Sequence, residues 1–166
     1  MIVVVALLLL FSSIVVLSFS SSRKSTEREK ATKQFATLVS LARTIAVNNN
    51  GIYQVAYYFP FREMWIDEVD ENGVVIRPKI IAPKKLVESV DLIQVRVLPR
   101  NGVGDVYEKD TAKRALITFY PDASSDYAVV TFLHSSFDGT RDDQFDSIVV
   151  YSSTGIARTY LNRKKL

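Results

Sequence analysis

The first 22 residues constrain this chain most, because they carry no charged side chain. Sixteen of them are apolar and the other six are serine. The run Met1–Phe19 approaches the roughly 20 apolar residues that cross a bilayer as a helix, and every charged side chain lies in the residues that follow. We therefore expect a single N-terminal membrane helix, residues 1–22, that carries one domain large enough to bury its own core.

A cleaved secretory signal is the alternative for this segment. Such signals begin with a basic stretch and have a shorter apolar core, whereas no basic residue precedes the apolar run here, so a retained helix is favoured. Arg23, Lys24 and Arg28 directly follow the span, and the positive-inside tendency would keep the next domain in the cytoplasm. A basic leader removed by processing would reverse this orientation, and the sequence leaves both orientations open.

The net charge of +3 is divided unevenly along the chain. Residues 23–50 hold six basic and two acidic side chains, residues 51–155 hold 11 basic and 16 acidic, and residues 156–166 hold four basic and none acidic. The body of the chain is therefore acidic, which argues against a uniformly basic nucleic-acid-binding surface. The absence of cysteine excludes a disulfide framework and thiol catalysis.

The apolar pattern predicts that the helix continues after the span. Between Thr26 and Asn50 there is neither proline nor glycine, and apolar residues recur at three- and four-residue steps, at Phe35, Leu38, Val39, Ala42, Ile45 and Ala46. The run Asn48–Gly51 is typical of a helix C-terminus. We expect one helix over residues 2–49, whose second part, within residues 23–50, is amphipathic and packs on the domain.

After Gly51 the apolar period changes from 3.6 to 2. Runs rich in β-branched and aromatic residues, separated by turn signals, predict about seven strands. These runs are Ile52–Phe59, Met64–Val69, Leu92–Leu98, Ala115–Tyr120, Tyr127–His134, Ser147–Ser152 and Ile156–Leu161. The expected fold class is α+β, with a long N-terminal helix packed on an antiparallel β domain of residues 51–166.

The sequence gives little support for catalysis. It contains one histidine, His134, at the end of a predicted strand, and no cysteine, so the commonest catalytic triads and His/Cys zinc sites cannot form. His134 is expected to be a structural or surface residue. We expect no catalytic residue, no cofactor and no small-molecule substrate. A membrane-tethered hydrolase that uses two carboxylates remains an unspecific alternative, because acidic residues are abundant.

One loop could gather ligands for a metal ion. Its four aspartates could supply oxygen atoms to Ca²⁺; they are Asp138, Asp142, Asp143 and Asp146. Their spacing does not fit an EF-hand loop, and Arg141 lies among them. A solvated acidic loop is therefore favoured over a calcium site.

The basic C-terminal tail could contact the phosphates of a nucleic acid. Its cations are Arg158, Arg163, Lys164 and Lys165, with Tyr160 among them. The alternative is a soluble charge cluster, or one that pairs with the acidic body. Trp65 and the aromatic residues between Tyr53 and Phe61 are expected to serve core and edge packing.

Three segments resemble motifs of one family. Phe35–Asn50 (FATLVSLARTIAVNNN), with its Ala-Arg pair, is similar to the second half-helix of type IV pilins and type II secretion pseudopilins of the FimT/GspH class. Ile117–Ser125 (ITFYPDASS) resembles that family's i-x-F-x-P-D-G-S-S hairpin, and Ile148–Arg158 (IVVYSSTGIAR) resembles its i-x-v-x-x-x-T-G-x-x-R terminal strand. Val5 stands where the family usually has glutamate, and Ala123 where it often has glycine.

The resemblance implies a minor pilin-like (pseudopilin) subunit of a type IV pilus or a type II secretion filament, acting in assembly, initiation or tip recognition. It also implies a single span in the inner membrane, with the β domain in the periplasm or in an extracellular filament. Met1 would be a processed, methylated N-terminus or a truncated start, or the chain would not be a conventional substrate of the processing peptidase. The partners implied are other pilin subunits, met through an assembly helix that includes Met1, Val5, Leu8, Phe11 and Val15.

A DNA-binding minor pilin that acts in DNA uptake is the alternative within this family. Some FimT proteins bind DNA through a G-R-x-R tail. The corresponding residues here are Gly155, Ile156, Ala157 and Arg158, so only the second arginine of the motif is present.

Overall fold

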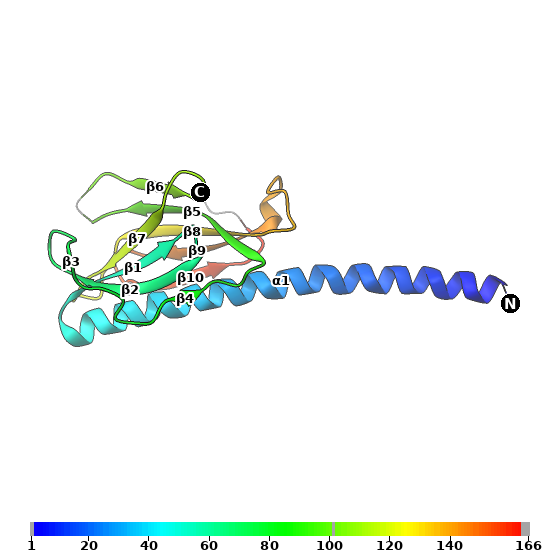
Figure 1. Ribbon diagram of the computed structural model, residues 1–166, viewed down its shortest axis with the longest axis horizontal. Coiled ribbons are helices and arrows are strands. Elements are labelled where there is room, and N and C mark those ends of the chain that lie inside the picture. Colours follow the sequence, from blue (N-terminus) through cyan, green and yellow to red (C-terminus); the bar gives the residue numbers. More distant parts are fainter. Residues whose placement is uncertain (1, 101, 164–166) are drawn as a thin grey trace.

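The structure, a computed structural model, describes the backbone of residues 2–100 and 102–163 and the side chains of residues 23–100 and 102–163. Helix α1 (Ile2–Asn49) runs without interruption. Its C-terminal half lies along the β structure, and its N-terminal half projects well beyond it (Figure 1). The expected continuous helix that ends at residue 49 is therefore confirmed.

The helix ends at the predicted stop signal. Asn50 adopts a left-handed backbone conformation with φ at 51°. The Gly51 N–H donates to the Ala46 carbonyl at 3.2 Å, and the Asn50 N–H donates to the Val47 carbonyl at 3.4 Å. This pair of hydrogen bonds satisfies carbonyl groups that the end of a helix would otherwise leave unpaired.

The rest of the described chain forms two antiparallel sheets of five strands each. One has the order β3-β2-β1-β7, with β4 also paired to β2, and the other has the order β10-β9-β8-β5-β6. The strands are β1 (Ile52–Tyr58), β2 (Glu63–Val69), β3 (Val75–Arg77), β4 (Lys84–Lys85), β5 (Val90–Leu98), β6 (Asp105–Glu108), β7 (Arg114–Phe119), β8 (Tyr127–His134), β9 (Phe145–Val150) and β10 (Ala157–Tyr160).

The α+β class is confirmed, but the expected number of strands was too low. All seven predicted runs form strands, and β3, β4 and β6 are additional. These three have only two to four residues, and most of their side chains are exposed. A short strand without a buried face lacks the alternation of apolar and polar residues by which a strand is recognised, so the sequence did not indicate them.

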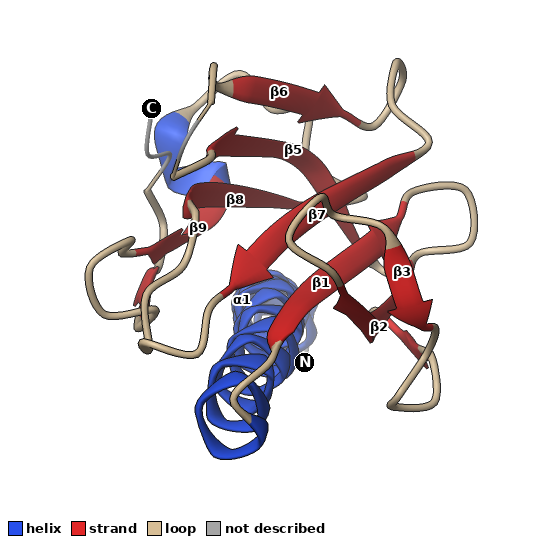
Figure 2. Cartoon of the chain, turned by 90° about the vertical axis from the view of Figure 1, so that its left-hand side faces the viewer, coloured by secondary structure: helices blue, strands red, loops and turns tan. Residues whose placement is uncertain are grey.

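The core lies where α1 meets both sheets. Viewed along the helix, the two sheets lie on one side of α1 (Figure 2). The side chains that α1 buries recur every three or four residues; they are Arg28, Ala31, Thr32, Phe35, Leu38, Val39, Ala42 and Ala46. The Phe35 ring meets the Phe132 ring of β8 edge-on, with 5.8 Å between centroids. The second half of α1 is therefore part of the domain core.

Over the residues whose side chains are described, no helix is long and apolar enough to cross a membrane. The segment expected to do so, residues 1–22, lies outside that set. The boundary expected at residue 22 therefore stays a prediction.

Replacing Phe35 tests whether the helix is part of the core. Phe35→Ala should lower the free energy of unfolding by about 3–5 kcal/mol, because it empties a buried ring site between α1 and β8. Leu41→Ala, on the outer side of the same helix, should cost about 1 kcal/mol or less. Urea unfolding of the full chain in detergent measures both, and equal losses would contradict the packing described.

Candidate functional site

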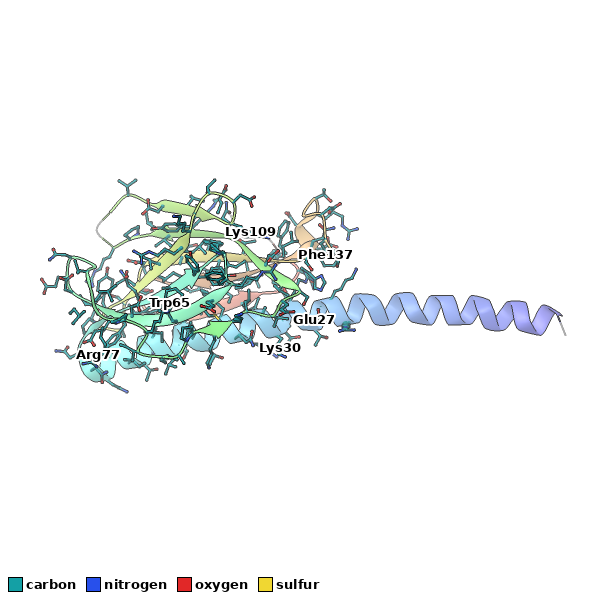
Figure 3. The ribbon with its side chains drawn as sticks, in the orientation of Figure 1. Glu27, Lys30, Trp65, Arg77, Lys109 and Phe137 are labelled. Carbon is teal, nitrogen blue, oxygen red and sulfur yellow. The ribbon has the colours of Figure 1, made fainter. Side chains whose placement is uncertain are left out.

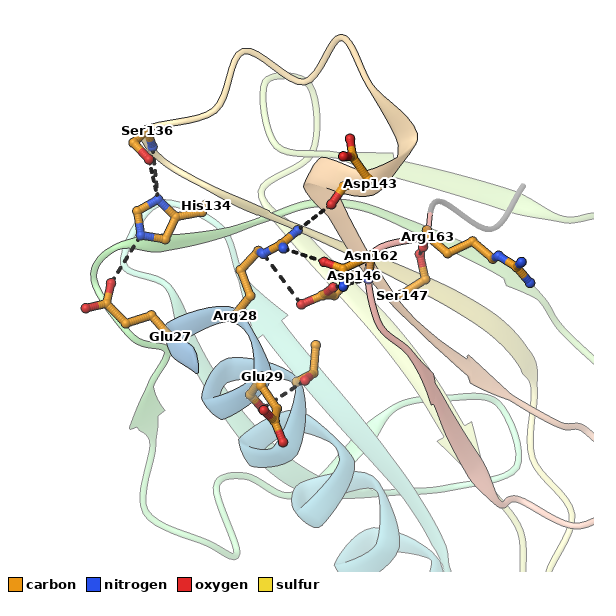
Figure 4. A network of polar contacts seen from close by, with 11 residues as sticks. Glu27, Arg28, Glu29, His134, Ser136, Asp143, Asp146, Ser147, Asn162 and Arg163 are labelled. Carbon is orange, nitrogen blue, oxygen red and sulfur yellow. Dashed lines mark hydrogen bonds and ion pairs between the residues drawn. The ribbon is translucent and has the colours of Figure 1, made fainter. Parts of the chain in front are cut away.

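A network of polar contacts lies where α1 leaves the β structure. It joins three segments: α1, the β8–β9 loop with its short 3₁₀ helix η1 (Asp142–Gln144), and the turn that follows β10 (Figure 4). We call it the helix-exit cluster and define it as Glu27, Arg28, His134, Asp146 and Asn162. Glu27 and the loop residue Phe137 both lie on the side from which the helix projects (Figure 3).

Arg28 is the centre of the helix-exit cluster. Only 3% of this residue is exposed, and its guanidinium donates to the Asn162 side-chain oxygen at 2.7 Å and to the Asp143 backbone carbonyl at 3.3 Å. Its Nε lies 3.7 Å from Oδ2 of Asp146. A buried charge is strongly unfavourable unless it is paired and hydrogen-bonded. The charge of Arg28 therefore ties the helix to both other segments.

Asp146 is the buried counterpart of Arg28. Its Oδ1 accepts a hydrogen bond from the Asn162 backbone N–H at 2.6 Å. Burial raises the pKa of the Asp146 carboxyl, and the Asn162 N–H and the Arg28 charge act against that rise. Asp146, the second residue of β9, thus links this strand to the turn after β10 and to Arg28 of the helix.

The β8–β9 loop also touches the helix through an aromatic ring. Lys24 Nζ lies 5.2 Å from the centroid of the Phe137 ring, and the Arg28 guanidinium carbon lies 5.3 Å from it. Both distances fall within the range of cation–π attraction. The loop is therefore held against α1 by this ring as well as by Arg28.

His134, at the end of β8, forms the other half of the cluster. It is 7% exposed, and its Nδ1 accepts from the Ser136 backbone N–H at 3.1 Å. Because Nδ1 acts as the acceptor, the neutral ring carries its proton on Nε2, which lies 3.1 Å from Oε2 of Glu27. His134 thus connects the start of the loop to the helix.

Glu27 is a partly exposed carboxylate with several partners. The neighbouring Ser89, Arg23 and His134 side chains lower its pKa to about 2. Of these, the Arg23 guanidinium and the His134 imidazole lie at hydrogen-bond distance from its carboxylate, at 2.9 and 3.1 Å. Glu27 therefore remains ionised over the whole neutral and mildly acidic range, and it stays an acceptor for His134.

The aspartates proposed as weak calcium ligands do not converge. Asp138 accepts from the Thr140 N–H at 3.1 Å, Asp143 pairs with Arg141, and Asp146 is held by Arg28 and Asn162. Within residues 23–100 and 102–163 no group of three or more histidine, cysteine, aspartate or glutamate side chains could share a metal ion. Each of these three carboxylates has a separate structural partner instead.

The basic residues of the C-terminal tail are described only in part. Arg158, on β10, lies with its guanidinium carbon 5.9 Å from the Tyr151 ring. The backbone carbonyl of Arg163, an exposed residue, accepts from the Ser147 hydroxyl at 3.0 Å. Lys164 and Lys165 lie outside the described residues, so nucleic-acid contact by the tail stays a prediction.

Trp65 lies on β2 with its ring partly exposed (Figure 3). Its Nε1–H donates to Asp67 at 2.9 Å, and Lys79 Nζ lies 5.2 Å from the ring centroid. The other carboxylate oxygen of Asp67 accepts from the Lys79 backbone N–H at 2.7 Å. Trp65 therefore helps to hold the connection between β3 and β4 against the sheet.

The three segments that carry the family resemblance meet in the structure. Arg43 Nε donates to the Thr154 carbonyl at 2.7 Å, and the Ser125 N–H donates to the Ser152 carbonyl at 2.8 Å. A Cβ added at Gly155 would lie only 2.8 Å from the Ala123 carbonyl oxygen. Ala123 itself has a φ of 66°, a conformation that favours glycine. Contacts between the motif residues thus connect α1 to the β9–β10 turn, and connect that turn to the β7–β8 turn.

The side of α1 that faces away from the sheets is a second candidate site, because it carries a hollow with few charged side chains. It forms a shallow hollow of about 630 Å³ lined by Lys33, Ala36, Thr37, Ser40, Leu41 and Thr44. We call this surface the outer face of α1. Apart from Lys33, the side chains of this face carry no charge. Arg43, the next charged residue of the helix, is bonded to the β9–β10 turn. The outer face is therefore suited to contact with another protein surface.

Comparison with known proteins supports a pilin-like fold. No protein-family model and no curated protein matches the chain. Among solved structures it is similar to the minor pseudopilin EpsH of the type II secretion system of Vibrio cholerae, with a TM-score of 0.56 and 9% identity over 86% of this chain and 99% of that chain. A second structure of EpsH has a TM-score of 0.56 and 8% identity over 84% of this chain and 99% of that chain.

The type IV minor pilin FimU of Pseudomonas aeruginosa is also similar, with a TM-score of 0.56 and 11% identity over 82% of this chain and 90% of that chain. At such low identities the likeness concerns the fold. The chain therefore has the fold of minor pseudopilins and minor pilins, as the three motif segments predicted.

The lowered pKa of Glu27 predicts how the contacts of the helix-exit cluster contribute to stability at different pH values. Because the pKa is lowered from 4.5 to about 2 on folding, the ionised carboxylate stabilises the fold above about pH 4.5, and this stabilisation is lost as the pH falls through about 2. Glu27→Gln should therefore lower the free energy of unfolding at pH 7, and the difference from the original chain should shrink toward pH 2.

Glu29→Gln is the matched control, because Glu29 lies two residues further along α1 and pairs with the exposed Lys33 at 2.6 Å. It should have a smaller effect at neutral pH. Denaturant titrations of the full chain in detergent between pH 2 and pH 7 measure the difference. A Glu27→Gln effect that is the same at every pH would contradict the assigned contacts.

Proposed function

We propose that this chain is a minor pilin-like (pseudopilin) subunit of a type IV pilus or a type II secretion filament, acting in assembly, initiation or recognition at the tip. The observation that supports this most is the arrangement of α1. One continuous helix supplies the domain core with its second half and projects from the domain with its first half. A catalytic centre is not part of the proposal.

The projecting half would serve as the anchor before assembly and as the filament core afterwards. Residues 1–22 have no charged side chain, so they are suited to lipid and to a bundle of helices alike. Transfer from the bilayer to a filament replaces lipid contacts by helix contacts, at a modest change in free energy. In this proposal the chain spans the inner membrane once, and its β domain lies outside the cytoplasm.

The helix-exit cluster would fix the direction in which the anchor leaves the domain. Arg28 is bonded to segments that follow β8 and β10, and Glu27 is bonded to His134. These contacts lie within the first turns after residue 22. The domain and the anchor would therefore move as one body, so the position of the helix among its neighbours determines the position of the β domain.

Neighbouring subunits would contact two surfaces of α1. One is the assembly helix, with Met1, Val5, Leu8, Phe11 and Val15, and the other is the outer face of α1. Because Val5 replaces the glutamate usual in the resembling family, the contact made there would be apolar. An apolar contact in place of an ion pair suits a tip-located or accessory subunit.

Photocrosslinking in the native host tests this proposal. Leu8 is replaced by the photocrosslinking amino acid p-benzoyl-phenylalanine in the full chain, and adducts are identified by mass spectrometry of membranes and sheared filaments. We expect adducts with other pilin-like subunits, because Leu8 would face their helices. The matched control places the same amino acid at Val74, which is 61% exposed on the β2–β3 connection and should not give those adducts.

If position 8 gave adducts only with lipid or with unrelated membrane proteins, the proposal that the chain is a filament subunit would be contradicted. Adducts of equal yield from positions 8 and 74 would also count against it, because they would show contact without a preferred surface.

A further inference from the structure

The hairpin of β5 and β6 exposes more large apolar side chains than a surface hairpin requires. Leu98, Val103 and Val106 are 53%, 88% and 54% exposed. Strand β6 is the outermost strand of its sheet, and it lies on the side of the β structure away from α1 (Figure 1). Neither the core nor the helix-exit cluster uses these residues.

A hollow lies beside Val106 on the outer face of the same sheet. It has a volume of about 300 Å³, and its lining includes Arg96, Leu98, Val106, Tyr127 and Val129. Arg96 is the register partner of both Val106 and Val129, so these three residues form one row across the sheet. The hollow can therefore take one apolar side chain that approaches from beyond β6.

The outer edge of β6 has free backbone groups. The Lys109 N–H donates to the Ile93 carbonyl at 3.0 Å, and the register pairs Tyr107 with Val95 and Asp105 with Val97. Because hydrogen-bonded and non-hydrogen-bonded pairs alternate in an antiparallel ladder, Tyr107 and Asp105 bond toward β5. The N–H and C=O of Val106 then point outward, and no described strand lies on that side.

The charges of β6 indicate what kind of segment fits this edge. Asp105 and Glu108 are exposed at the two ends of the strand, with Val106 between them. Lys109, the nearest cation along the chain, is bonded to Asp91 at 2.7 Å. The edge therefore presents an apolar centre between two carboxylates.

A second copy of the chain leaves the charges of this edge without a cation. Because the backbone of Val106 faces outward, antiparallel pairing of β6 with itself places Val106 opposite either Val106 or Glu108 of the other copy. Neither register brings an unpaired cation to Asp105 or Glu108, since Lys109 is bonded to Asp91. A segment with basic residues on either side of an apolar one would place opposite charges there instead.

We propose that the outer edge of β6 is a docking site for an extended segment of another protein that carries an apolar residue flanked by lysine or arginine. The segment adds a strand to the sheet through the backbone of Val106. Its apolar side chain fills the hollow beside Val106, and its basic side chains lie opposite Asp105 and Glu108. This surface is separate from both surfaces of α1, so the inference goes beyond the proposed function and does not rest on it.

A peptide selection tests the proposal. A phage library of random dodecapeptides is selected against the full chain in detergent, and the enriched peptides are synthesised and measured by fluorescence anisotropy. We expect them to share an apolar residue between basic ones. Val106→Lys should weaken their binding at least tenfold, because it places a cation in the apolar centre. Val74→Lys, a change of a similarly exposed valine on the β2–β3 connection, should leave binding within twofold.

A charge reversal, Glu108→Lys, and hydrogen exchange test whether the peptides bind at the edge of β6. The charge reversal should weaken binding of the basic peptides, and bound peptide should slow exchange of the Val106 amide. Failure to enrich any peptide, binding that survives Val106→Lys, or enriched peptides without basic residues would each overturn the proposal. Self-association of the chain that Val106→Lys abolishes would also overturn it, because the occupant would then be a second copy.

Discussion

Burial of the inner stripe of α1 against both sheets is the interaction on which the rest of the structure depends. Phe35, Val39 and Ala42 are at most 1% exposed, and they belong to one apolar cluster that includes residues of each sheet. Small residues at 31, 42 and 46 allow the strands to approach the helix closely. The helix is thus the shared core of the two sheets, and the sheets in turn determine which half of the helix is buried and which half projects.

Polar contacts complete the arrangement at both ends of the buried half. At its C-terminal end Arg43 bonds the turn between β9 and β10, and at its N-terminal end Arg28 is enclosed by the helix-exit cluster. These bonds fix the direction of the helix more than they stabilise the fold, because a buried ion pair gains little net free energy over apolar packing. A fixed direction of the helix is the property that the proposed filament role requires.

Much of the fold could be predicted from local patterns, and most of the candidate site could not. The 3.6-residue period from Phe35 to Ala46, the Asn-Gly stop and the alternation in β8 each carry a local signal. The helix-exit cluster has none, because it joins residues of α1 to residues more than 100 positions further along the chain. Arg28 resembled a solvated charge next to the membrane and Asp146 a loop carboxylate. The one available signal was that Arg28 lies on the buried stripe, one turn before Ala31 and Thr32.

Native-state hydrogen exchange of α1 in the full chain, in detergent, tests most directly whether the helix and the sheets form one cooperative unit. The amides of residues 31–46 should exchange only through global unfolding, with the same free energy and the same denaturant dependence as the central residues of β8. Exchange of the helix at a clearly lower free energy than β8 would contradict the account, because it would show that α1 detaches while the sheets remain folded.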